Sequence, residues 1–166
     1  MDWYMTILRF IHVLFAIVWV GGTAFIVLFF QPGLRKLDPA VGAPAMLAVV
    51  PRAIVGLIFS AGVVFLMGIL MVLNVLGLDG LGKLFSTDWG RSILMGFLFA
   101  TTMFGIGIVF VARNVFRMRA AARSGTTIEP AQAIRMQSQL RYGAMTALAF
   151  GILAVGAMMF ARDFNP

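Results

Sequence analysis

The chain has 166 residues, of which 61% are hydrophobic and only 11% are charged, and its net charge is +7. Soluble domains carry roughly 45–50% apolar and about 25% charged residues, so this composition excludes a soluble protein and predicts an integral membrane protein. The chain has no cysteine, which excludes disulfides, thiolate metal sites and iron–sulfur clusters. Most basic residues flank hydrophobic stretches, so we expect membrane lipid, and no nucleic acid, as their partner.

Four hydrophobic stretches are long enough to cross about 30 Å of hydrocarbon as helices. We therefore expect an all-α fold, an integral membrane four-helix bundle that forms a single transmembrane domain over residues 1–166. The predicted spans cover about 4–30, 53–76, 92–111 and 142–160. A membrane β-barrel is excluded, because each stretch is continuously apolar over about 20 residues instead of alternating over about 10.

The connection between the first two spans is rich in residues that interrupt helices. Between Pro32 and Pro51 it contains Pro39, Gly42 and Pro44. Proline and glycine in such a density are typical of a loop. We expect a loop here, with one short interfacial helix that begins at Asp38.

The connection between the third and fourth spans has a different character. Residues Arg113 to Arg123 include no glycine or proline and are rich in arginine and alanine, so the third span should continue as a helix beyond the membrane. Ser124-Gly125 should end that helix, and a following helix should lead into the fourth span. The sequence thus predicts a basic helical hairpin at about 112–141.

Basic residues are concentrated in these two connections, which lie on one side of the predicted bundle. Nine are found there, namely Arg35, Lys36, Arg52, Arg113, Arg117, Arg119, Arg123, Arg135 and Arg141. Cytoplasmic loops carry such an excess of Lys and Arg. We expect a multi-pass protein of the bacterial inner (cytoplasmic) membrane, with both termini on the periplasmic side.

His12 is the only histidine, and it lies within the first hydrophobic span. An ionisable residue inside a membrane span is by default a hypothesis for a functional site. On a helical wheel Met5, His12, Trp19 and Thr23 share one face, which should point into the bundle. Arg9 lies one turn before His12. In a chain without cysteine, His12 is the strongest available ligand for a metal or a haem.

Several methionines are expected at the depth of His12, namely Met67, Met71, Met95 and Met158 or Met159. Imidazole and thioether together suit Cu(I), and a His/Met pair is also known as axial ligands of haem. In a haem site, Arg9 and Arg91 could meet the propionates. A homodimer could instead supply one His12 from each chain. The structural alternatives are that methionine fills apolar space and that His12 bonds a carbonyl or a hydroxyl, such as that of Ser60, Thr101 or Thr102.

The stretch from Leu8 to Gly22, LRFIHVLFAIVWVGG, resembles the first helix of the CopD-like copper-resistance membrane proteins and of the related HemJ-type protoporphyrinogen oxidases. The shared pattern is a His, six residues, a Trp and a Gly pair. Asp88-Trp89-Gly90-Arg91 is a second, shorter similarity. The resemblance implies that His12 would be a copper or haem ligand in a four-helix membrane protein.

Three functions follow as expectations. The first is a haem b-binding membrane protein that uses His12 as axial ligand, in electron transfer or haem-linked redox chemistry, with a redox partner protein. The second is copper binding or transport through His12 and nearby methionines. The third is a non-catalytic membrane subunit whose basic hairpin docks a partner. A homo-oligomer is expected in each case.

Overall fold

The structure is a computed structural model that describes residues 3–161 and residue 164. All regular secondary structure of these residues is helical, which confirms the all-α prediction. The first hydrophobic stretch folds as a continuous helix in which two segments, η1 and η2, have π-helical hydrogen bonding. In chain order its parts are α1 (Trp3–Ala16), η1 (Ile17–Gly21), α2 (Gly22–Phe25), η2 (Ile26–Phe30) and α3 (Gln31–Leu34).

The remaining chain forms three further long helices and one short one. A third π-helical segment, η3, joins α6 to α7. The elements are α4 (Pro39–Leu76), α5 (Lys83–Ser86), α6 (Asp88–Ile106), η3 (Gly107–Ala112), α7 (Arg113–Ser124) and α8 (Pro130–Ala161).

Four continuous helices are long and apolar enough to cross a membrane. They cover Trp3–Leu34, Ala40–Leu76, Asp88–Ser124 and Pro130–Ala161, with 32, 37, 37 and 32 residues. Each predicted span lies inside one of them. At 1.5 Å per residue they measure roughly 48–56 Å, so each helix is longer than the about 30 Å of hydrocarbon in a typical bilayer.

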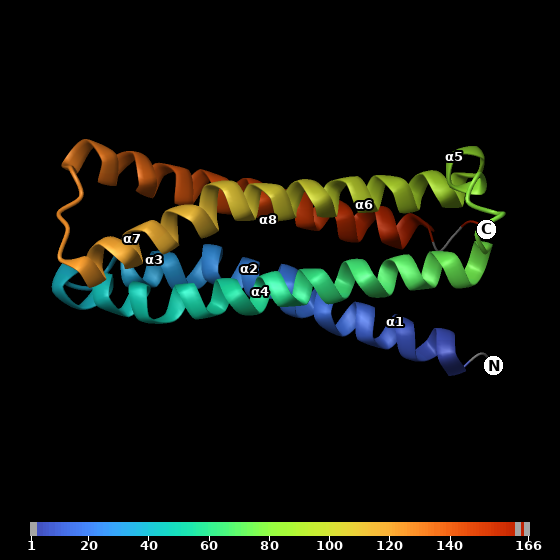
Figure 1. Cartoon of the computed structure of the whole chain (residues 1–166), viewed down its shortest axis with the longest axis horizontal. Helices are drawn as coiled ribbons and strands as arrows, with labels where there is room; N and C mark the ends of the chain where they lie inside the picture. The colour runs from blue at the N-terminus through green and yellow to red at the C-terminus, as the bar shows by residue number, and fades with distance from the viewer. Residues whose placement is uncertain (1–2, 162–163, 165–166) are drawn as a thin grey trace.

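The helices associate as two pairs. The most extensive packing is between α6 and α8, followed by that between α1 and α4. Figure 1 shows the two pairs separated at the end that carries the start of α1 and the end of α8, which we call the terminal end. At the other end α7 packs against α4. We call this the basic end, because α7 and the start of α8 bring most of the nine basic residues to it.

The prediction of a loop between Pro32 and Pro51 is wrong for most of these residues. Helix α4 begins at Pro39, where the Asp38 carboxylate accepts a hydrogen bond from the Ala40 amide at 2.7 Å, and it continues through Pro44 and Pro51. The start at Asp38 is thus confirmed, but the helix does not stop before the membrane. Pro51 is almost completely buried, so packing offsets the backbone hydrogen bond that proline cannot make.

The connection predicted as a helical hairpin contains α7 and the first turns of α8. Helix α7 ends at Ser124, and Gly125 follows with φ +66°, in the left-handed conformation that glycine adopts without strain. Figure 1 shows α7 and the start of α8 joined by the short connection at the basic end. The core beneath it consists of Val50, Ile54, Ala112, Val115 and Leu140.

Candidate functional site

His12 lies on the side of α1 that packs against α4. Its Nδ1 atom is 3.0 Å from the carbonyl oxygen of Val64. Because a carbonyl oxygen only accepts, Nδ1 carries the proton, and Nε2 of the neutral ring keeps its lone pair. Among the described residues Nε2 has no hydrogen-bond partner, and none of their fully buried side-chain nitrogens or oxygens lacks one. Nε2 is therefore accessible at the surface of the chain.

Gly68 allows the imidazole to lie close to α4. A Cβ atom at position 68 would be 3.3 Å from His12 Cε1, which is closer than most real contacts of a Cβ, and 3.6 Å from Nδ1, which is an ordinary contact. The ring is thus held on two sides, by the hydrogen bond to Val64 and by the backbone of Gly68. A histidine fixed through Nδ1 to a backbone carbonyl, with Nε2 available, has the arrangement that metal-ligating histidines adopt.

The helical face predicted for the first span is confirmed. Met5, Leu8 and Trp19 are buried, and His12 is half-buried between them. Arg9, one turn nearer the terminal end than His12, is exposed. The alternative prediction, that His12 forms a hydrogen bond with a carbonyl or hydroxyl group, is also confirmed. The acceptor is the carbonyl of Val64 and not one of the hydroxyl groups named as examples.

Two of the predicted methionine ligands share the side of α4 that carries the His12 contacts. Met67 and Met71 follow Val64 by three and seven residues, and such spacings place residues on one side of a helix. Both side chains are half-buried. They are thus the methionines that the fold brings to the same helix pair as His12.

The other two methionines belong to the second helix pair. Met158 on α8 packs on Gly96 of α6, where a Cβ would overlap the methionine side chain. Met95 on α6 is 46% exposed. The packing of Met158 explains its place in the interface of α6 with α8, so the thioethers are divided between two helix pairs.

Trp19 belongs to the hydrophobic core in the middle of the bundle. Its ring packs against Phe65 and Phe104, with centroid distances of 5.7 and 6.3 Å. Phe65 also contacts Phe97 at 5.6 Å, so this aromatic cluster joins the two helix pairs. Trp19 therefore has a clear packing role.

An interior cavity of about 70 Å³ extends from Trp19 toward the basic end. Its walls are almost entirely apolar, with the polar side chains of Thr23 and Gln31 at its edge. The Thr23 hydroxyl donates to the Trp19 carbonyl at 2.8 Å. His12 is not among the residues that line this cavity, so the cavity and the histidine are separate features.

All three π-helical segments border the cavity, η1 with Trp19, η2 with Ile26 and Val27, and η3 with Ile108 and Val111 among others. A π-helical turn is wider than an α-helical turn and is frequent at functional sites. Here the wide turns surround the space where the four helices converge. The sequence carries no simple signal for them.

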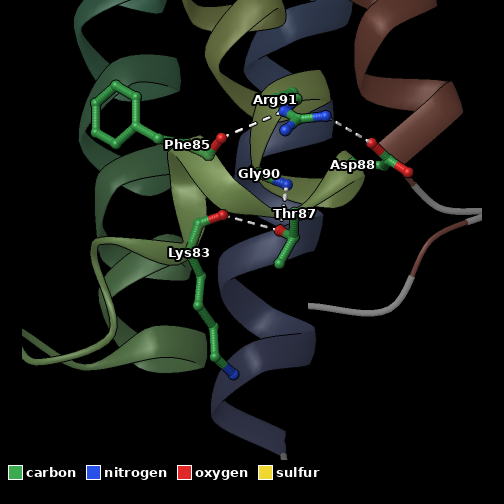
Figure 2. Close-up of polar contacts among 6 residues, drawn as sticks. All are labelled: Lys83, Phe85, Thr87, Asp88, Gly90 and Arg91. Atoms are coloured by element: carbon green, nitrogen blue, oxygen red, sulfur yellow. Dashed lines mark hydrogen bonds and ion pairs between the residues drawn. The ribbon is translucent and has the colours of Figure 1, made fainter.

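Arg91, expected near a haem propionate, is part of a local turn at the terminal end. Its Nη1 lies 3.2 Å from the Asp88 carboxylate, and its Nε donates to the Phe85 carbonyl at 3.2 Å. Figure 2 shows this guanidinium beside the turn that joins α5 to α6. The side chain is nevertheless 62% exposed.

The same turn explains the short motif around Gly90. The Thr87 hydroxyl accepts a hydrogen bond from the Gly90 amide at 3.0 Å and caps α6. A Cβ at Gly90 would overlap the backbone of Lys83 and Leu84, so glycine allows α5 to pack on α6. This part of the sequence therefore has a structural role.

Comparison of the chain with protein families, with curated proteins and with solved structures gives no match. The roles of its residues therefore rest on their chemistry and on the geometry described above. Among the described residues there is also no group of three or more His, Cys, Asp or Glu that could hold a metal ion.

Proposed function

We propose that this chain is a membrane protein that binds haem b with Nε2 of His12 as an axial ligand. The observation that carries the proposal is the hydrogen bond from Nδ1 to the Val64 carbonyl, which fixes the tautomer and leaves Nε2 as an accessible lone pair. The donor chemistry fits a haem. The interior cavity does not contribute, because His12 does not line it.

Other residues of the α1–α4 pair would complete such a site. The exposed guanidinium of Arg9 lies one turn from His12 and is suited to a propionate. Met67 or Met71 on the facing side of α4 would be the thioether ligand. Haem b supplies reversible one-electron chemistry when bound, and the chain fixes the orientation of its ligand, His12. Electron transfer with a partner protein at the periplasmic side of a bacterial inner membrane is the function that we infer.

Copper binding is the second candidate. It is favoured by Met67 and Met71, which share the side of α4 that carries the His12 contacts. One imidazole with two thioethers is a ligand set suited to Cu(I). Met95 and Met158 would have no part in that site, because they belong to the other helix pair.

The test is an absorption spectrum of the detergent-purified protein, oxidised and then reduced with dithionite. The decisive variant is His12→Asn, because its amide nitrogen can still donate to Val64 while Nε2 is removed. We expect a Soret band with sharp reduced α and β bands in the wild type, and the loss of these bands in the variant. Met95→Leu is the matched control and should keep them.

Two outcomes would contradict the haem proposal. The first is a featureless visible spectrum from haem-replete cells, after which the copper content of the same sample decides the second candidate. The second is a haem spectrum that His12→Asn leaves unchanged. Elution volume and thermal unfolding of the variant show that a lost spectrum does not reflect misfolding.

A further inference from the structure

A groove at the surface of the second helix pair has the features of a ligand site. It has a volume of about 290 Å³ and lies between α8 and the end of the α6–η3 helix. Its location is toward the basic end, because Phe110 lies three residues before Arg113. Ile106 and Phe110 form one wall, and Ser138, Gln139, Tyr142 and Thr146 on α8 form the other.

The amide group of Gln139 is fixed at this groove by a buried partner. Asn114 is 3% exposed, and its Nδ2 donates to the Phe110 carbonyl and to Gln139 Oε1, both at 2.9 Å. Because Oε1 is the acceptor in this pair, the Nε2 amino group of Gln139 keeps its donors. No residue of the described chain uses them, so they are available to a ligand oxygen.

The hydroxyl groups of the groove are also unpaired. Several serines and threonines in the helices, such as Ser60 and Thr102, donate to the carbonyl four residues earlier. Within the described part of the chain, Ser138 and Thr146 make no hydrogen bond of any kind. The two residues are roughly 12 Å apart along α8, so they offer donors at two depths of the groove.

Arg141 supplies positive charge at the edge of the groove. Its guanidinium carbon lies 5.8 Å from the centre of the Tyr142 ring, which is one of the lining side chains. A guanidinium stacked over an aromatic ring can still donate its N–H groups to acceptors beside the ring. The same end of the bundle carries nine basic residues but only Asp38 and Glu129 as acids. The excess of positive charge at this end therefore favours the binding of an anionic ligand.

We propose that this groove binds one anionic glycerophospholipid of the adjoining leaflet. The phosphate is recognised by Arg141, by the Gln139 amino group and by the Ser138 hydroxyl, and the ester oxygens by the Thr146 hydroxyl. An acyl chain lies along Ile106 and Phe110. Along α8 from the basic end, Ser138, Gln139 and Arg141 come before Thr146. The groups that meet the phosphate thus lie nearer the basic end than the hydroxyl that meets the ester oxygens, as for a lipid that enters the membrane. The proposal is independent of haem or copper at His12.

The experiment measures lipid binding to the full chain in detergent by native mass spectrometry. The probes are phosphatidylglycerol, phosphatidylcholine and glycerol 3-phosphate. Arg141→Gln removes the charge, and Gln139→Glu keeps an acceptor for Asn114 but replaces the amino donor by an anion. Arg123→Gln is the matched control, because it removes an exposed arginine at the basic end that lies on α7 and not on the groove-lining face of α8.

We expect phosphatidylglycerol to bind more tightly than phosphatidylcholine, and each groove variant to weaken it about tenfold or more, as for loss of a charged hydrogen bond. Arg123→Gln should change it less than twofold. Thr146→Trp, which fills the groove, should also abolish binding, whereas Thr101→Trp on exposed α6 surface should not. These two variants keep every arginine in place.

Three results would overturn the proposal. Equal losses in Arg123→Gln and Arg141→Gln would show only diffuse attraction to the basic end. Equal affinity for phosphatidylcholine would remove the role of the anion. Competition by glycerol 3-phosphate as strong as that of the whole lipid would identify a site for a soluble phosphate ester, because the acyl chain would then contribute nothing.

Discussion

The Nδ1 atom of His12 lies 3.0 Å from the carbonyl oxygen of Val64, so a polar contact links α1 to α4. We expect His12→Leu to lower the free energy of unfolding by about 1 kcal/mol, the usual net value of such a bond. His12→Asn should lose much less, since its amide can donate to the same oxygen. Unfolding in mixed detergent measures both. Equal stability of the two variants would contradict this role.

Gly68 should control the position of the imidazole. A valine at this site would push the ring away from α4, because even a Cβ comes within 3.3 Å of His12 Cε1. We expect Gly68→Val to reduce the haem content of the purified protein if His12 is the ligand. Gly62→Val is the control, because a Cβ there meets no atom within 4 Å. Equal haem content in both variants would argue against the site.

Gly90 should be required for the packing of α5 on α6. Its Cβ would overlap the backbone of Lys83 and Leu84, so we expect Gly90→Ala to cost about 1–3 kcal/mol of stability. Gly105→Ala lies in the same long helix in open space and should gain about 0.5–1 kcal/mol from higher helix propensity. Thermal unfolding compares them. We expect Gly90→Ala to lower the melting temperature and Gly105→Ala to raise it. A shift in the same direction for both variants would contradict the overlap at Gly90.

The interior cavity should accept additional methyl groups. Ala147 lines it and is 3% exposed, so we expect Ala147→Val to raise the stability by about 0.5–2 kcal/mol. Ala61, which is fully buried away from the cavity, has no such space, and Ala61→Val should cost about 1–3 kcal/mol. Thermal melting of both variants checks this. Destabilisation by Ala147→Val would show that the space is not open to side chains.

The four membrane-length helices were predictable because hydrophobic length alone determines them. The continuous α4 was not, since Pro44 and Pro51 are locally typical of an interruption. Pro51 is almost completely buried, and its packing offsets the cost of one missing backbone hydrogen bond. A local sequence pattern does not contain that tertiary contribution.

The candidate site was predictable only in part. Helical periodicity placed His12 and Trp19 on the inward face of the first helix, and both positions are confirmed. Counting residues along the spans placed Met158 at the depth of His12, but this could not show that Met158 packs within the other helix pair. The bond between Asn114 and Gln139 joins residues 25 positions apart on different helices, so no spacing rule finds it.

Helix α8 runs from Pro130 to Ala161 without a π-helical segment or an internal proline. Arg141 and Met158 are 17 positions apart on it, or roughly 26 Å along its axis. The helix is thus one uninterrupted rod that keeps these two residues at a fixed separation. Because no wide turn or proline offers a hinge between them, a change in the tilt of α8 at Arg141 would be felt at Met158 as well.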